Sequence, residues 1–280
     1  MMSNIRKYIG LPYLVWILLF VLMPLVLLFF QSFQSQENTL TLANYMNFFT
    51  WSYIKMTIMS FIYALIITLF TLIVSYPIAL LINSLRHKQL WLLIIILPTW
   101  INVLLKTYAF IGVFVKDGLL NNILNVFHLA DQQFLFTPMA FIIVSVYIFI
   151  PFMILPIFNS LQDIDPALIR ASHDLGASKI ETFKRVIIPL SMNGVKTGIQ
   201  VVFIPALSLF MITRLIAGNT IVTLGTAIEQ QFLFNQNFGM GSTIGVFLVI
   251  IMILIMLVTK SNDQYGGCLL YTSPSPRDRG

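Results

Sequence analysis

The sequence predicts an all-α integral membrane protein with six transmembrane helices. Of its 280 residues, 58% are hydrophobic and only 9% are charged, and the mean hydropathy is +0.90, which excludes an ordinary soluble globular domain. A membrane-spanning helix needs about 20 mostly apolar residues, and it must be helical because irregular backbone cannot face lipid. Six stretches of this kind occur, at roughly Leu11–Phe30, Thr57–Ile82, Leu90–Val115, Pro138–Phe158, Gly194–Thr213 and Gly241–Thr259.

The distribution of Lys and Arg predicts that both termini are cytoplasmic, because cytoplasmic loops carry an excess of these residues. With the N-terminus inside, the cytoplasmic side receives ten of them: Arg6, Lys7, Arg86, Lys88, Arg170, Lys179, Lys184, Arg185, Lys196 and Lys260. The other side receives four: Lys55, Lys106, Lys116 and Arg214. Topology therefore accounts for the net charge of +6, and no basic run is long enough to indicate nucleic-acid binding.

The longest polar interruption, about residues 161–190, is predicted to form two short helices with a sharp corner between them. Asp165 and Pro166 are typical of an N-cap followed by proline at the first helical position, and the first helix is expected over Ala167–Leu175. Gly176 stands where that helix should end. Ser178 is followed three residues later by Glu, the spacing of a capping box at the start of a second helix.

This stretch resembles the cytoplasmic coupling loop of bacterial ABC importer permeases, whose pattern is E-A-A-x3-G-x9-I-x-L-P. Ala171, Gly176 and Pro189 fall on the spacing, with Val186 and Ile188 as conservative replacements. The surrounding segments IPFMILPIFNSLQDID, ASHDLGASK and TFKRVIIPL are similar to spermidine/putrescine permeases, over about residues 11–260. The resemblance implies the MetI-like, type I permease fold in one domain, residues 1–260, within a bacterial inner membrane.

The resemblance also implies a mechanism. An extracytoplasmic binding protein delivers a polyamine, this chain pairs with a homologous permease in the lipid bilayer, and two ABC ATPase subunits drive transport through the coupling loop. The coupling residues it implies are Asp165, Pro166, Arg170, Ala171, Ser172, Asp174, Gly176, Ala177 and Pro189. Arg170 replaces the family's glutamate, so either the ATPase offers an acidic partner or that ion pair is missing. The alternative for this stretch is an amphipathic helix lying on the membrane.

The third predicted span is the least uniform and is the candidate lining of a substrate path. If it is one continuous helix, Asn102 and Lys106 share a face with Thr99, and Trp100 and Tyr108 lie on a neighbouring face. Polar groups at this depth usually face a protein interior or a water-filled cavity. Aromatic faces suit a cationic amine, whereas packing between helices, with the lysine reaching outward, is the competing interpretation.

Several kinds of chemistry have no motif in the sequence. There is no GxxxxGK[ST] loop for ATP phosphates, no HExxH, no GxSxG and no paired Cys, so we expect no enzyme activity and no cofactor or metal in this chain, with ATP and Mg²⁺ bound by the partner ATPase. A permease for another substrate class is an alternative. A secondary transporter or channel is a further one, although the predicted spans lack the Asp or Glu that carriers usually need.

The two ends of the chain differ in their predicted relation to the membrane domain. Arg6 and Lys7 precede an apolar run without a cleavage site, so the first span is expected to be retained. After Lys260 the composition becomes polar and rich in Pro, Ser and Gly, and residues 261–280 are expected to be a disordered tail. We interpret roughly Cys268–Gly280 as non-native sequence.

Overall fold

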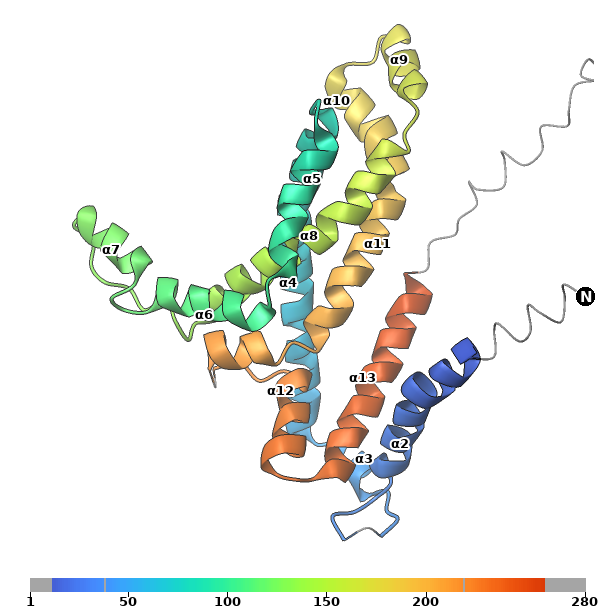
Figure 1. The fold of residues 1–280 in the computed structure, drawn as a ribbon, viewed down its shortest axis with the longest axis vertical. Coiled ribbons are helices and arrows are strands. Elements are labelled where there is room, and N and C mark those ends of the chain that lie inside the picture. The colour runs from blue at the N-terminus through green and yellow to red at the C-terminus, as the bar shows by residue number, and fades with distance from the viewer. Residues whose placement is uncertain (1–11, 38, 219, 260–280) are drawn as a thin grey trace, which may run out of the picture.

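The computed structural model describes residues 12–37, 39–218 and 220–259. The predicted tail lies outside these residues. The described part is a helical bundle without β-strands, apart from one isolated bridge between Gln34 and Leu40 (Figure 1). Its longer helices are α2 (Met23–Ser32), α4 (Trp51–Ser84), α5 (Lys88–Ile96), α6 (Val103–Phe114), α8 (Pro138–Gln162), α11 (Ile188–Leu207) and α13 (Phe238–Val258).

Shorter elements connect these helices. They are the α-helices α3 (Ala43–Phe48), α7 (Leu119–Val126), α9 (Pro166–Asp174), α10 (Lys179–Thr182) and α12 (Leu224–Glu229), and the 3₁₀ turn η2 (Leu97–Trp100). Four further turns have π-helical hydrogen bonding: η1 (Leu18–Leu22), η3 (Phe183–Ile187), η4 (Thr213–Ala217) and η5 (Gln230–Phe234).

The six-span prediction is confirmed, with one span broken. Five helical runs in the described residues are long and apolar enough to cross a membrane: Pro12–Ser32, Trp51–Ser84, Pro138–Gln162, Lys179–Leu207 and Phe238–Leu257. The third span is a pair of segments, Lys88–Trp100 and Val103–Val126, that meet at an angle of 89°. Successive spans alternate in direction, so α2 descends from, and α13 rises towards, the side that carries α9 (Figure 1).

The fifth span differs from its predicted bounds of Gly194–Thr213. Its helix already begins at Lys179, so the second helix of the predicted loop is not short but continues through η3 into α11. Its helix ends at Leu207, before the predicted end at Thr213. Just beyond this end, the Oγ1 of Thr223 donates to the carbonyl oxygen of Leu209 at 2.8 Å and ties that backbone to the start of α12.

The main core lies where α8 packs between α4 and α11. Ala64 and Ile67 of α4, Met153 and Ile157 of α8 and Val202 of α11 are fully buried there. A second, smaller core joins α3, α12 and α13.

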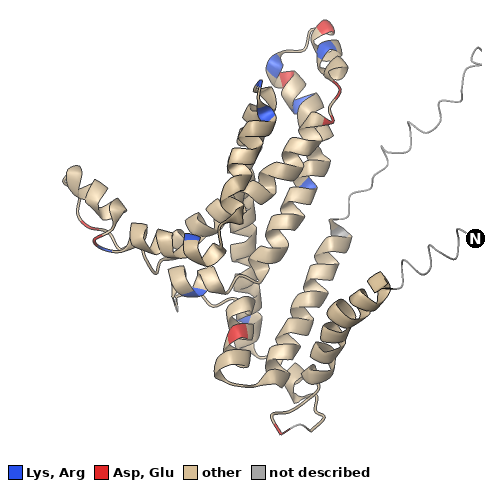
Figure 2. Cartoon of the chain, in the orientation of Figure 1, with Lys and Arg blue, Asp and Glu red and all other residues tan. Residues whose placement is uncertain are grey.

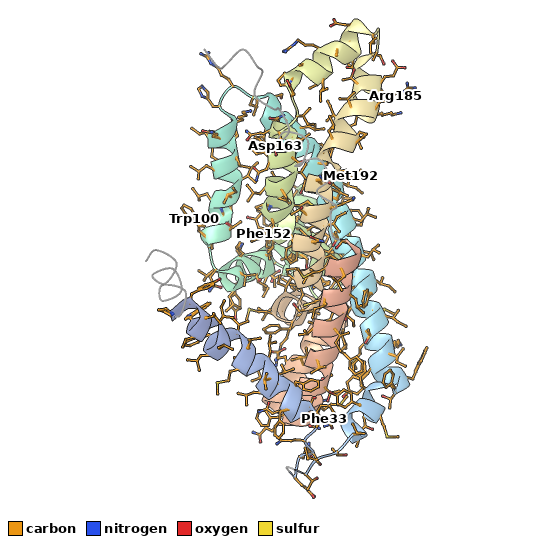
Figure 3. All side chains as sticks on the ribbon, turned by 90° about the vertical axis from the view of Figure 1, so that its right-hand side faces the viewer. Phe33, Trp100, Phe152, Asp163, Arg185 and Met192 are labelled. Carbon is orange, nitrogen blue, oxygen red and sulfur yellow. The ribbon has the colours of Figure 1, made fainter. Side chains whose placement is uncertain are left out.

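Charged residues lie mainly at the ends of the helices. Figure 2 shows them around α9 and α10 and again near α6, α7 and α12, while the long helices between are almost free of charge. In the perpendicular view, Asp163 and Arg185 lie towards the α9 end of the molecule and Phe33 lies at the opposite end (Figure 3). This arrangement is typical of a chain that crosses a bilayer.

Candidate functional site

The α9–α10 turn, residues 165–182, begins with the predicted cap. Asp165 has extended backbone angles, and its Oδ1 accepts a hydrogen bond from the Ala167 amide at 2.8 Å. Pro166 occupies the first helical position, where its missing N–H costs nothing. The helix covers Pro166–Asp174 and so lies one residue earlier than the predicted Ala167–Leu175.

The corner is a Schellman motif centred on Gly176. The Gly176 amide donates to the His173 carbonyl at 2.9 Å, and the Ala177 amide donates to the Ser172 carbonyl at 3.0 Å. Gly176 has φ of +82°, a left-handed conformation in which a side chain is strained, although a Cβ there would contact nothing within 4 Å. The predicted glycine corner is therefore confirmed, and its requirement for glycine comes from the backbone alone.

The second helix begins with the predicted capping box. The Ser178 amide donates to the Glu181 carboxylate at 2.9 Å, and the Glu181 amide donates to the Ser178 hydroxyl at 3.3 Å. A further contact ties the two helices together, since the hydroxyls of Ser172 and Thr182 lie 2.9 Å apart. Thr182 is buried, so this serine, which replaces an alanine of the family pattern, gives it a hydrogen-bond partner.

The remaining residues of the predicted coupling set lie on the outside. Arg170, Ala171 and Asp174 are exposed on α9, and Arg170 has no ion pair among the described residues. Pro189 lies in the first turn of α11, directly after η3, where a missing backbone N–H is tolerated.

The turn presents an apolar surface. No residue of α9 is buried, and Leu168, Leu175 and Ile180 are exposed, with Leu175 at 89%. Exposed apolar side chains surrounded by charges are typical of a surface that contacts another protein. Nothing in the described bundle covers these side chains.

The candidate substrate path does not have the predicted geometry. Pro98 cannot donate a backbone hydrogen bond, so α5 passes into the 3₁₀ turn η2. Asn102 then caps α6, with its Oδ1 accepting from the Leu104 amide at 2.8 Å. The shared face of Thr99, Asn102 and Lys106 is therefore wrong, because the chain turns through 89° between Thr99 and α6.

The two predicted aromatic residues of the path face away from the bundle. Trp100 is 77% exposed and lies at its outer edge (Figure 3), and Tyr108 is 56% exposed. Thr99 is half-buried instead and lines two apolar cavities against α8, of about 290 and 300 Å³. Lys106 also lines the cavity of about 300 Å³. The structure therefore does not bring Trp100 and Thr99 together in one cavity.

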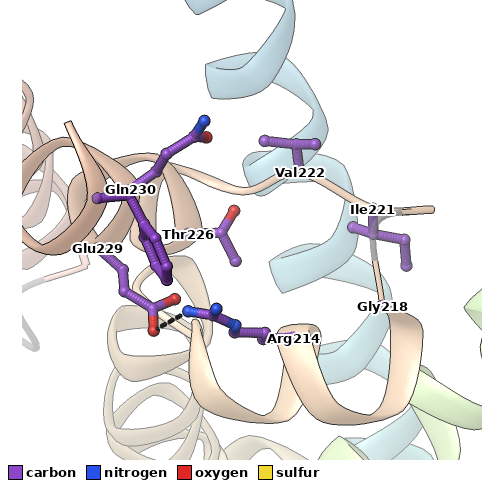
Figure 4. Close-up of a pocket in the computed structure, with 8 residues that line it drawn as sticks. Arg214, Gly218, Ile221, Val222, Thr226, Glu229 and Gln230 are labelled. Atoms are coloured by element: carbon purple, nitrogen blue, oxygen red, sulfur yellow. Dashed lines mark hydrogen bonds and ion pairs between the residues drawn. The ribbon is translucent and has the colours of Figure 1, made fainter.

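A polar cavity of about 370 Å³ lies between η4, α12 and η5, where the sequence analysis proposed no site (Figure 4). The Arg214 Nη1 donates to the Glu229 Oε1 at 2.7 Å, and the Arg214 guanidinium carbon lies 4.5 Å from the centre of the Phe234 ring. One signal in the sequence marks this site. Glu229 is the single carboxylate between Glu181 and Asp263.

Metal ligands do not gather in the part of the chain that the structure describes. No group of three or more His, Cys, Asp or Glu side chains there is close enough to hold a metal ion. Besides helix caps and hydroxyl contacts between helices, the polar interactions of the described residues include one ion pair and several side-chain amide hydrogen bonds, such as those of Asn121.

Solved structures share the architecture described above. A chain of a bacterial ABC transporter that imports the acidic polysaccharide alginate superposes with a TM-score of 0.74 at 17% identity, covering 92% of this chain and 94% of that one. A chain of the MetNI methionine ABC transporter in an inward-facing conformation gives a TM-score of 0.54 at 16% identity, over 74% of this chain and 92% of that one. The fold is that of an ABC importer permease of the MetI-like, type I class.

Similarity in sequence narrows this class to a family. The chain is 36% identical over 253 residues to the spermidine/putrescine transport system permease protein PotB of Escherichia coli K12, covering 87% of this chain and 92% of the relative. It is 32% identical to PotB of Haemophilus influenzae, and the match covers 87% of this chain and 88% of that relative. No protein-family model matches the chain. The chain belongs to the family of spermidine/putrescine transport system permease proteins.

Proposed function

We propose that this chain is the membrane-spanning permease subunit of an ATP-driven importer that moves polyamines such as spermidine and putrescine into the bacterial cytoplasm. The observation that carries the proposal is the 36% identity to PotB over 92% of that relative's length. A bundle with broken and tilted helices and with two cavities next to α8 suits a translocation path. We expect the chain to bind no cofactor itself.

The α9–α10 turn is the proposed contact with the ATPase. Its exposed Leu168, Leu175 and Ile180 offer apolar area, while the caps at Asp165 and Ser178 hold both helices in one geometry. A rigid, exposed helix can transmit the movement of a partner into the span that follows it. Because α10 continues into α11 without a break, a push on the turn is carried directly into the fifth span.

The other subunits follow from the same proposal. A homologous second permease completes the path, two ATPase subunits bind ATP and Mg²⁺, and an extracytoplasmic protein delivers the substrate. A solved alginate transporter contains such a substrate-loaded periplasmic protein, and a chain of that complex superposes on this chain with a TM-score of 0.75 at 19% identity.

The excess of Lys and Arg near α9 supports placing the α9–α10 turn and both termini in the cytoplasm. Cysteines at Asn125 and Lys179, both exposed, test this orientation after replacement of Cys268 by serine. An impermeant thiol reagent should label position 125 in spheroplasts and position 179 only after lysis. Labelling of both in intact spheroplasts would reject the orientation.

Uptake of labelled spermidine by the reconstituted four-part transporter tests the function itself. We expect ATP-dependent, saturable uptake that unlabelled putrescine competes and amino acids do not. Proteoliposomes without the ATPase are the control, because uptake that persists there would indicate an ATPase-independent carrier. Competition by amino acids instead of putrescine would assign the chain to another substrate class.

A further inference from the structure

The cavity that contains Arg214 and Glu229 combines a mostly buried carboxylate with an accessible cation. The Glu229 side chain is 15% exposed, whereas that of Arg214 is 45% exposed. A carboxylate withdrawn from water needs a positive partner, because an unpaired buried charge is strongly disfavoured. Here the chain supplies that partner itself, from the long Arg214 side chain that extends from η4 to Glu229 (Figure 4).

The surroundings of the guanidinium are those of a cation-binding site. Glu229 provides the negative charge, and Phe234 provides a ring face at 4.5 Å. A carboxylate beside an aromatic face is the combination that recognises organic cations, and an alkylammonium fits it as well as a guanidinium does. The cavity continues past apolar Ile221 and Val222, which suit the methylene chain of such a cation.

The segments on either side of Glu229 are anchored to the distant helix α4. The Leu224 amide at the start of α12 donates to the Ser60 hydroxyl of α4 at 2.7 Å, and the Gln231 side chain in η5 donates to the Tyr53 hydroxyl at 2.9 Å. Arg214, by contrast, projects from the π turn η4 and makes one hydrogen bond to Glu229 rather than a paired set. The turn η4 is itself anchored by the buried Ile216 and Ala217, so the two side chains differ in exposure rather than in backbone support. The enclosed member of the pair is Glu229, and the replaceable member is Arg214, whose long side chain is 45% exposed.

We infer that this cavity is a transit site for one ammonium group of the transported polyamine, and that Arg214 is a resident cation which the substrate displaces from Glu229. This inference rests on the proposed function. The exchange replaces one cation by another, so Glu229 is never left unpaired. A competing resident cation also keeps the site weak, as transit requires binding that is favourable enough to fill and weak enough to empty. Helix α12, which lines the cavity, lies in the half of the bundle away from α9 (Figure 1), where the proposed orientation places substrate arrival.

The concentration dependence of spermidine uptake by the reconstituted transporter tests the site. We expect Glu229→Gln to raise the KM about tenfold, since it removes a charge-assisted hydrogen bond to the ammonium. Arg214→Gln should lower the KM, because the competitor is gone, and the double variant should resemble Glu229→Gln. A purely structural ion pair gives another pattern: both single variants lower the amount of assembled transporter, and the double variant restores it. That pattern, or an unchanged KM in Glu229→Gln, would overturn the inference.

A thiol at the position of the displaced cation gives a second readout that does not need transport. In Arg214→Cys with Cys268 replaced by serine, a cationic methanethiosulfonate should react faster than an anionic one, and spermidine should slow the reaction. Glu229→Gln should abolish the preference for the cationic reagent. Leu233→Cys is the control, because Leu233 is exposed on η5 but does not line the cavity.

The two tests separate the inference from the proposed function. If the wild-type transporter does not take up spermidine, the proposed function fails, while the charge preference at position 214 still reports whether Glu229 attracts cations. If the wild-type transporter takes up spermidine but Arg214→Cys shows no charge preference and no protection, the inference alone fails.

Discussion

The α9–α10 turn and the α12–η5 segment (residues 223–237) both connect long helices, yet they are stabilised in different ways. In the first, the fixing contacts join residues within ten positions of each other, such as Asp165 to Ala167 and Ser172 to Thr182. In the second, partners from α4 are 164 and 178 positions away in the chain. The first is therefore an exposed unit that can move as one piece, whereas the second is part of the bundle.

The difference suits the proposed roles. A segment that transmits movement benefits from local bonds, which survive when its position relative to the bundle changes. A segment that positions a carboxylate benefits from bonds to the core, which keep that carboxylate in place while a flexible cation is exchanged. Substitutions in the two segments should consequently have different effects on stability and on coupling.

The largest effect is expected for Gly225→Ala in α12. A Cβ at Gly225 would clash with the carbonyl group of Ser208, whose carbon atom would lie 2.7 Å from it. Because this carbonyl group belongs to the backbone, the backbone itself must move to make room. We expect a loss of about 1–3 kcal/mol of stability, seen as a lower melting temperature of the purified complex. Gly112→Ala in α6 is the matched control, since a Cβ there contacts nothing within 4 Å. Equal melting temperatures would show that α12 is not held as closely as described.

A smaller and different effect is expected for Gly176→Val at the corner. The space around Gly176 is open, so the cost is the left-handed backbone, about 1–2 kcal/mol for a β-branched residue. The protein should remain in the membrane, because α9 buries nothing, but ATP hydrolysis should no longer drive spermidine uptake. Gly176→Asn is the control, because asparagine tolerates this conformation better. Wild-type coupling in Gly176→Val would remove the turn from the mechanism.

The smallest effect is expected for Ser172→Ala, which removes the hydroxyl that Thr182 contacts at 2.9 Å. We expect a loss of about 0.5–1.5 kcal/mol, confined to the turn and measured as faster proteolysis between α9 and α10. Replacing Thr182 by valine as well should recover most of the loss, because no polar group is then left unpaired. If the double variant is cleaved faster than Ser172→Ala, the hydroxyl pair is not what holds the two helices together.

The third span shows where sequence reasoning reached its limit. Pro98 and Asn102 break this span, whereas the sequence analysis places Asn102 on one polar face of a continuous helix together with Thr99 and Lys106. Proline and asparagine also occur inside membrane helices when neighbours satisfy the backbone, so their presence does not decide between a kink and a break. In the structure the break consists of the 3₁₀ turn at Pro98 and the cap by Asn102, and Pro98 and Thr99 line a cavity against α8.

The sequence by itself determined the membrane class, the number of spans and the α9–α10 turn. These depend on hydropathy over about 20 residues and on caps formed within a few positions, such as Ser178 with Glu181. Only the tertiary structure decided the bend at Asn102, the end of the fifth span at Leu207 and the meeting of Arg214 with Glu229. The bend arises from Pro98 and the cap by Asn102, which a continuous membrane helix can also contain. The other two features involve segments that meet across an irregular loop, and such partners are fixed by packing, which no local pattern records.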